Sequence, residues 1–302
     1  MWASAIALIV LLAAGWLLSF YLRQDKTHVF YRLRGRYQGI SVLESRRSED
    51  SLIRLVSLRN HRGETPATAF VRRPVILAPE YKIVLVYAGA KTRAKILDLI
   101  PERPDVVLVA PQYPYGSHRG LLRSLRAPYD VRKAAFRTVA AGLLATSFLQ
   151  ETEHLDLRRL TVIGSSVGTA FATLHGALDT RVPRVILIHG GGDFPTIIRF
   201  MERRRGRPWS GEMKARLASI VVDTFDPIHW AHRIAPRELI LIGARDDGYF
   251  PAASTLELFA RAGEPKSLIW TDTEHVRSRK TETLDEVLEL IDQRLGSGPG
   301  AR

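Results

Sequence analysis

The chain has 302 residues, of which 46% are hydrophobic, so it can bury the core of one large α/β domain or of two small domains. It contains no cysteine, which excludes disulfide bonds, thiolate metal sites and a cysteine nucleophile. The formal net charge of +13 indicates an anionic environment, either nucleic acid or a phospholipid surface.

The N-terminal segment favours the phospholipid surface. Residues 2–22 carry no charged side chain, and an apolar helix of that length spans the roughly 30 Å hydrocarbon core of a bilayer. We therefore expect a transmembrane anchor over residues 1–22. Basic residues follow this run and none precedes it, so the positive-inside tendency places the rest of the chain on the cytoplasmic side. The alternative is a cleaved signal peptide and export, which normally has basic residues before a shorter apolar core.

Residues 23–50 are strongly basic and lack clear periodicity, which predicts a juxtamembrane connector lying against anionic headgroups. From residue 51 to residue 295, short β-branched runs alternate with helical patterns. The expected strands are 51–58, 67–71, 82–88, 105–110, 160–163, 184–189, 238–243 and 267–271. The expected helices are 92–100, 130–150 with Asp130 as N-cap, and a C-terminal amphipathic helix that ends near Leu295.

This alternation predicts one α/β domain over residues 51–295, built on a mostly parallel, doubly wound sheet, with residues 296–302 as a flexible tail. The strand pattern is interrupted over about residues 193–235, which predicts a helical lid insertion. Two interpretations of its arginines stay open: a solvated basic face, or a lid that faces a membrane or an anionic substrate. The arginines are Arg199, Arg203, Arg204, Arg205 and Arg207, next to Phe200 and Trp209.

The motif G-x-S-x-G, with Ser166 at its centre, lies between a predicted strand and a run that is compatible with a helix. A serine on a sharp strand-to-helix turn needs small residues two positions before and after it, and Gly164 and Gly168 stand there. Centring the motif on Ser165 would place bulky β-branched residues at those positions. Ser166 is therefore the candidate nucleophile.

A serine nucleophile needs a histidine base and a carboxylate that orients the histidine, in the chain order serine, acid, histidine. Asp246 and Asp247 follow the predicted strand 238–243, and His275 follows the predicted strand 267–271. Every other histidine precedes Asp246, so this order selects His275.

With these residues the chain resembles the α/β-hydrolase superfamily, in particular serine esterases and dienelactone-hydrolase-like members, over about residues 51–295. Residues 226–251 are similar to the stretch that leads into the acid-bearing strand of these proteins. Counted from Gly243, the resemblance implies Asp246 as the acid, with Asp247 capping the turn; Asp247 and Asp193 remain alternative acids. The expected oxyanion hole combines the backbone N–H groups of Val167 and Ala90.

The sequence thus predicts a membrane-anchored serine hydrolase that cleaves a small carboxylic ester, with lipids among the candidates, through an acyl-enzyme intermediate. A thioesterase or serine peptidase would use the same triad, and a non-catalytic scaffold at the membrane is the alternative from another class. No phosphate-binding loop, metalloprotease motif, dinucleotide fingerprint or nucleic-acid-binding motif is present, so no metal, cofactor or nucleic acid is implied. The glycines in residues 189–193 (HGGGD) follow the nucleophile, so we do not assign them to the oxyanion hole.

Overall fold

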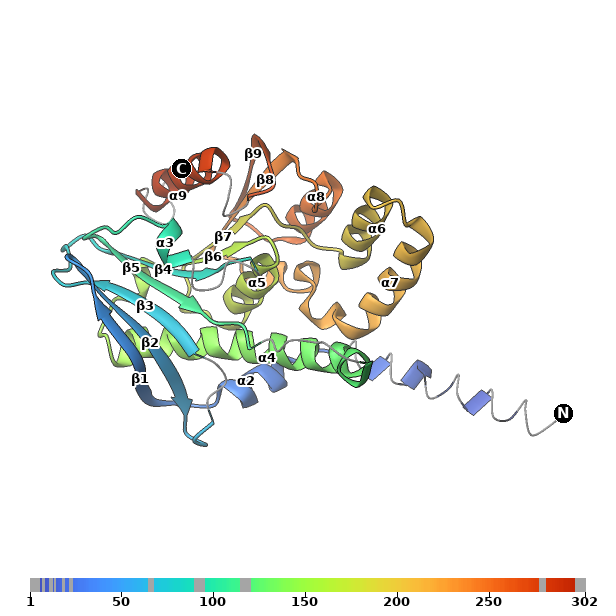
Figure 1. Ribbon diagram of the computed structural model, residues 1–302, viewed down its shortest axis with the longest axis horizontal. Coiled ribbons are helices and arrows are strands. Elements are labelled where there is room, and N and C mark those ends of the chain that lie inside the picture. Colours follow the sequence, from blue (N-terminus) through green and yellow to red (C-terminus); the bar gives the residue numbers. More distant parts are fainter. Residues whose placement is uncertain are drawn as a thin grey trace.

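A twisted sheet runs through the fold and carries helices on both faces (Figure 1). The computed structural model describes residues 6, 9–10, 13, 15–17, 20–21, 24–64, 68–89, 96–114, 121–276 and 281–296. Within these residues, nine strands form one sheet in the order β1-β2-β3-β5-β4-β6-β7-β8-β9. The strands are β1 (Tyr37–Arg47), β2 (Ser51–Asn60), β3 (Thr68–Pro74), β4 (Lys82–Tyr87), β5 (Val106–Pro111), β6 (Leu160–Ser165), β7 (Arg184–Ile188), β8 (Glu238–Asp246) and β9 (Lys266–Glu274).

The sheet is antiparallel at one end and parallel over the rest. β1, β2 and β3 pair antiparallel, β3 also meets β5 antiparallel, and all pairs from β5 to β9 are parallel. The parallel strands β5 and β7 are buried along their whole length, because their β-branched residues pack on both faces of the sheet. The predicted mostly parallel α/β architecture is confirmed.

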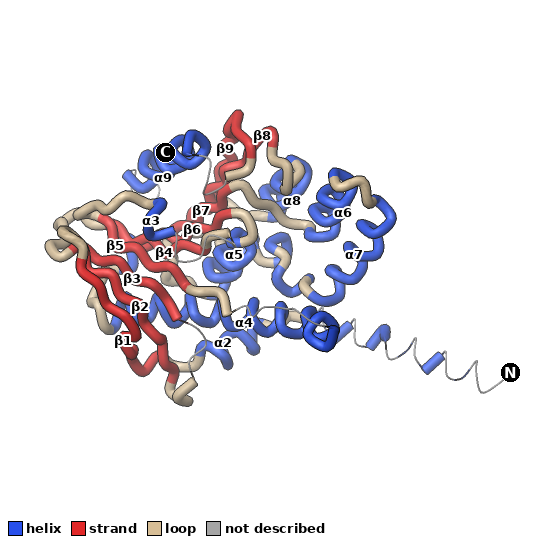
Figure 2. Tube along the Cα trace, in the orientation of Figure 1, coloured by secondary structure: helices blue, strands red, loops and turns tan. Residues whose placement is uncertain are grey.

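The helices cover the two faces in separate groups (Figure 2). They are α2 (Thr27–Arg34), α3 (Ile96–Leu99), α4 (Leu121–Glu151), α5 (Gly168–Leu178), α6 (Phe194–Arg204), α7 (Pro208–Val221), α8 (Ala252–Arg261) and α9 (Thr281–Gly296). One core joins α2, α4, α5 and α8 to the sheet, for example through Phe148, Leu174 and Leu258. The other core joins α3 and α9 to the opposite face through Leu97 and Val287. The strands and the site they carry are thus held from both sides.

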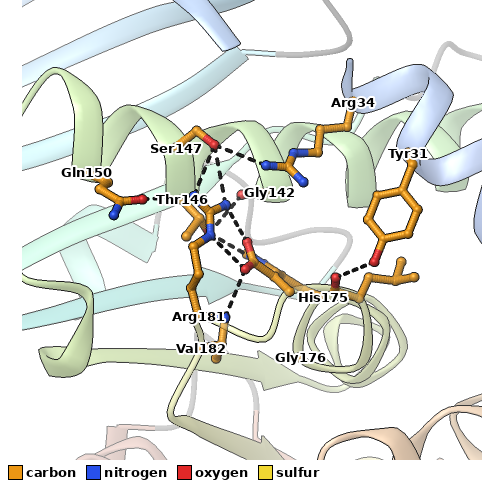
Figure 3. A network of polar contacts seen from close by, with 12 residues as sticks. Tyr31, Arg34, Gly142, Thr146, Ser147, Gln150, His175, Gly176, Arg181 and Val182 are labelled. Carbon is orange, nitrogen blue, oxygen red and sulfur yellow. Dashed lines mark hydrogen bonds and ion pairs between the residues drawn. The ribbon is translucent and has the colours of Figure 1, made fainter. Parts of the chain in front are cut away.

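Residues 27–47, expected to belong to a basic connector, instead form α2 and β1 and are part of the fold. Phe30 of α2 is fully buried and its ring lies 4.8 Å from that of Phe136. Figure 3 shows the polar contacts of the same helix, in which the Tyr31 hydroxyl donates to the Leu178 carbonyl oxygen at 2.7 Å and Arg34 donates to Ser147. One buried aromatic side chain among many basic residues gives little periodicity, so the sequence pattern did not predict this helix.

Two further expectations differ from the structure or lie partly outside its described part. Asp130 does not cap a helix, because α4 begins at Leu121 and runs through Pro128. A proline removes one helical hydrogen bond, but the helix continues here because its following turns pack against the sheet. The helix expected at 92–100 is described only as α3, since residues 90–95 lie outside the described residues.

The predicted anchor lies largely outside the described part of the chain. Residues 2–22 are described at nine positions only. Of the helices in the described part, none is sufficiently long and apolar to cross a bilayer.

Candidate active site

Ser166 lies on a strained turn between β6 and α5. Its φ of 56° is in the left-handed region, which is unfavourable for a residue with a side chain. Two backbone hydrogen bonds hold the turn: the Ser166 N–H donates to the Ile188 carbonyl at 3.0 Å, and the Thr169 N–H donates to the Ser166 carbonyl at 3.0 Å. The surrounding strand and helix therefore fix the serine above the carboxyl ends of β6 and β7.

The two glycines of the motif have a direct steric cause. A Cβ atom on Gly168 would overlap the carbonyl oxygen of Tyr87 in the neighbouring strand β4. A Cβ atom on Gly164 would lie 2.6 Å from the Cβ of Ala172 in α5. Any larger residue at these positions would push the helix away from the strand, so the sharp turn needs glycine at both.

His275 faces the serine from the loop after β9. Its Nε2 lies 3.0 Å from the Ser166 Oγ, and its side chain is almost fully buried. The ring of Phe250 stacks on the imidazole with centroids 5.6 Å apart, and the ring of Tyr249 lies 4.9 Å away. These rings hold the imidazole in the plane that reaches the serine hydroxyl.

The carboxylate that meets His275 belongs to Asp247, whereas the sequence favoured Asp246. Asp247 Oδ2 accepts from His275 Nδ1 at 2.7 Å, and Asp247 Oδ1 accepts from the backbone N–H groups of Tyr249 and Phe250 at 2.7 and 2.9 Å. Because a carboxylate only accepts, Nδ1 carries the proton and Nε2 is left to accept from Ser166.

Asp246 fails to reach the site because β8 extends to it. Asp246 is still paired in the sheet with Glu274, and its side chain is exposed. The register between β8 and β9 shifts by one residue between Ala244 and Asp246, so a count from Gly243 selects an aspartate that does not contact His275. Asp247 caps the turn, as expected of it, and also orients the histidine.

Asp193, the other alternative acid, is occupied at the start of α6. It adopts a left-handed φ of 59°, and its carboxylate accepts from the backbone N–H and the hydroxyl of Thr196. Its own N–H and that of Phe194 donate to the buried carboxylate of Asp226 at 2.9 and 2.6 Å. Burial raises the pKa of Asp226 to about 6, although these donors favour its charged form.

One side of the expected oxyanion hole is described. Val167 precedes the first residue of α5, where backbone N–H groups point out of the helix, and its N–H has no acceptor among the described residues. Ala90, the other expected donor, lies outside the described residues. The preceding residue Ala88 is held by a hydrogen bond from the Tyr113 hydroxyl to its carbonyl oxygen.

His189 also lies at the site, although its place before Asp246 in the chain excluded it as the histidine of the triad. It is buried at the end of β7 with a left-handed φ of 45°, and its Nδ1 accepts from the backbone N–H of Val276, the residue after His275. Its Nε2 lies 3.3 Å from the Thr271 hydroxyl in β9. Burial lowers the pKa of His189 to about 4, so its ring is neutral and can accept at Nδ1. The sequence does contain a signal for this role, since His189 is the last residue of the predicted strand 184–189 that comes after the elbow in the chain.

His189, Asp247 and His275 bring their donor atoms within 4.8 Å of one another, a spacing that a metal ion could use. In this arrangement the Asp247 carboxylate already accepts a hydrogen bond from His275, and the His189 Nδ1 accepts one from the backbone N–H of Val276. The donor set therefore fits a hydrogen-bonded relay better than metal coordination.

An apolar cavity of about 310 Å³ opens beside Ser166. Its walls come from the elbow, from α6, from the end of α7 and from the turn after β8, and include Phe194, Ile197, Met201, Val222 and Phe250. Thr169 also lines it, and its buried hydroxyl has no hydrogen-bond partner among the described residues. The cavity can hold an apolar group next to the serine, with one polar side chain available to it.

No protein-family model matches the sequence. No curated protein matches it either. Solved structures do resemble the fold. Acetyl xylan esterase 1 from Thermoanaerobacterium sp. matches with a TM-score of 0.60 at 13% identity, over 91% of this chain and 94% of the esterase chain.

A cold-adapted esterase from an Arctic intertidal metagenomic library matches with a TM-score of 0.56 at 19% identity, over 85% of this chain and 100% of the other. A puromycin-hydrolyzing peptidase from Mycobacterium tuberculosis has a TM-score of 0.56 at 18% identity and covers 83% of this chain, which spans 40% of the peptidase. At these identities the likeness concerns the fold. The mostly parallel sheet and its serine-bearing strand-to-helix turn agree with it: the chain has the α/β-hydrolase fold.

Proposed function

We propose that this protein is a serine hydrolase that cleaves a carboxylic ester through an acyl-enzyme intermediate. The observation that carries the proposal is the continuous hydrogen-bonded series from Asp247 through His275 to Ser166, with distances of 2.7 and 3.0 Å. A serine, a histidine and a carboxylate in this geometry form the catalytic unit of many unrelated hydrolases.

The proposed reaction follows from the hydrogen-bond partners of the two His275 nitrogens. His275 Nε2 takes the proton of the Ser166 hydroxyl as Oγ attacks the acyl carbonyl, and Asp247 stabilises the imidazolium that results. The N–H of Val167, together with that of Ala90, would stabilise the oxyanion. His275 then gives its proton to the leaving alkoxide, and a water molecule activated by the same histidine releases the acid.

The apolar cavity supports an ester whose acyl part is longer than acetyl. Its aliphatic and aromatic lining, with side chains such as Ile197 and Met201, gains free energy from each buried methylene. A thioester places the same acyl group in the same cavity and stays an alternative substrate. Peptide hydrolysis is the other alternative, and one of the structures with this fold is a peptidase.

We also propose that residues 2–22 anchor the protein in a membrane, with the hydrolase domain on the cytoplasmic side. The support is the uncharged run itself and the basic residues that directly follow it. Glycosylation-site mapping or protease protection in membrane vesicles would distinguish this orientation from export with a cleaved signal peptide.

A fluorophosphonate probe tests the catalytic proposal. We expect covalent labelling of the full chain in detergent, and its loss in Ser166→Ala and, as a matched control, its retention in Ser165→Ala. Circular dichroism and thermal unfolding would establish that all three proteins are folded. A folded wild-type chain that no probe labels would overturn the proposal and favour a non-catalytic scaffold. A panel of esters, thioesters and peptides with equal acyl groups would then identify the bond that is cleaved.

A further inference from the structure

Three large apolar side chains of helix α7 lie on the outside. Trp209, Met213 and Leu217 follow one another at intervals of four residues, which places them along one stripe of the helix. They are 92%, 68% and 53% exposed. A surface helix of a globular protein normally has the opposite arrangement, with its large apolar residues facing the core.

The inner face of α7 explains why these side chains cannot turn inward. Gly211 and Ala215 are buried there, and a Cβ on Gly211 would lie 3.1 Å from the Cβ of Glu202 in α6. The two helices therefore approach closely through small residues, and there is no room between them for a tryptophan or a leucine. The close packing of α6 against α7 therefore keeps this apolar stripe on the outside of the helix pair.

The surroundings of this stripe are strongly basic. Residues 199–216 contain seven arginines and lysines but only two acidic residues. Glu202 is paired with Arg205 and Lys214 at 2.8 and 2.7 Å, and Glu212 with Arg199 and Arg216 at 2.8 and 3.2 Å. Both acids are thus neutralised within the cluster, and an excess of positive charge remains.

The helix pair projects from the fold on the side opposite the antiparallel strands β1, β2 and β3 (Figure 1). Arg132 of α4 donates to the carbonyl of Val221, the last residue of α7, at 2.7 Å. Twelve residues after the end of α7, Arg233 pairs with Asp25 at 2.8 Å and donates to the Thr27 hydroxyl. The residues that follow the apolar N-terminal segment are therefore bonded to the segment that follows α7.

We infer that the outer face of α7, formed by Trp209, Met213 and Leu217, binds a bilayer surface that contains anionic lipids, together with the exposed Arg203 and Arg204 at the end of α6 and Arg207 before α7. Apolar side chains of this kind enter the boundary between headgroups and acyl chains, and arginines pair with lipid phosphates. The complementarity of charge selects an anionic membrane. Because α6 supports α7 and also forms one wall of the Ser166 cavity, this binding would bring the cavity close to the membrane. The inference does not depend on hydrolysis.

The test uses the absence of cysteine from the chain. A single Met213→Cys substitution accepts an environment-sensitive fluorophore such as NBD, and Leu256→Cys, at an exposed site of α8, gives the matched control. The full labelled chains are reconstituted in phosphatidylcholine vesicles with and without phosphatidylserine. The emission at residue 213 is the readout, because vesicle binding alone would also report the N-terminal segment.

We expect a blue shift at residue 213, and quenching by a lipid-borne quencher, only with phosphatidylserine and only at low salt, while residue 256 stays in water. Replacing Arg203, Arg204 and Arg207 by glutamine should weaken this docking by about fivefold for each arginine removed. Equal emission at residue 213 in both kinds of vesicle and in the control would overturn the inference. A concentration-dependent blue shift without lipid would also overturn it, since a second copy of the chain would then cover the face.

Hydrolysis of a soluble short-chain ester separates this inference from the proposed function. Trp209→Ser should dock less and keep its activity toward that ester, because residue 209 does not line the cavity. Docking without any hydrolysis by the wild-type chain would refute the proposed function and leave the membrane face intact.

Discussion

Replacing Asp247 by asparagine changes one atom at the centre of the proposed triad. The asparagine oxygen can keep the hydrogen bonds from the N–H groups of Tyr249 and Phe250, so the turn should persist. The amide nitrogen would then face His275 Nδ1 at the present 2.7 Å and would have to donate to it. The proton of the neutral imidazole moves to Nε2, which points at the Ser166 hydroxyl and can no longer accept from it.

The expected loss in kcat is about 10³- to 10⁴-fold, as found when the equivalent substitution is made in serine proteases. A factor of 10⁴ corresponds to about 5.5 kcal/mol of transition-state stabilisation. The adjacent Asp246→Asn substitution provides the control. Its carboxylate is exposed at the end of β8, so we expect kcat to change by less than about threefold.

Both variants can be compared by steady-state hydrolysis of a soluble p-nitrophenyl ester and by the rate of fluorophosphonate labelling, with thermal unfolding as a control for folding. A large loss in Asp246→Asn, with Asp247→Asn near wild type, would refute the assignment of the acid and restore the sequence-based choice. Equal, small losses in the two variants would refute the triad itself.

Three further predictions concern the elbow, the histidine loop and the pH dependence of stability. Gly168→Ala should lower the free energy of unfolding in urea by about 3 kcal/mol, because its Cβ meets the Tyr87 backbone, whereas Gly296→Ala should have almost no effect. His189→Gly should reduce kcat by about 10- to 100-fold, because it removes the acceptor of the Val276 N–H hydrogen bond. His189→Asn should stay near wild type, because asparagine tolerates the left-handed φ and its side-chain oxygen can accept that hydrogen bond. Equal activities of the two variants would contradict this prediction. The pKa of the fully buried His175 is lowered from 6.5 to about 4, so only the unfolded chain binds a proton in between. His175 therefore lowers the free energy of unfolding by about 3 kcal/mol as the pH falls from about 6.5 to 4. The same pH dependence of stability in His175→Gln as in the wild type would disprove this prediction.

Much of the fold could be predicted because its signals are local. The β-branched runs predict the parallel strands, since a strand buried on both faces needs apolar side chains at every position. The segment 27–47 could not be predicted in this way. α2 is held by a few contacts from Phe30 and Tyr31 to residues more than a hundred positions away. Such contacts leave no periodic pattern in the local sequence.

The sequence by itself was sufficient to select Ser166, because the glycines on either side are required by the turn and stand at fixed spacing. It also selected His275, because the order of the chain left no other histidine. It favoured Asp246, whereas in the structure Asp247 meets His275. That choice depends on where β8 ends and on a register shift against β9, which pairing between strands sets and spacing along the chain does not. The role of His189 and the outward face of α7 likewise exist only once distant backbones have packed, since close approach decides which side chains are buried and which are left outside.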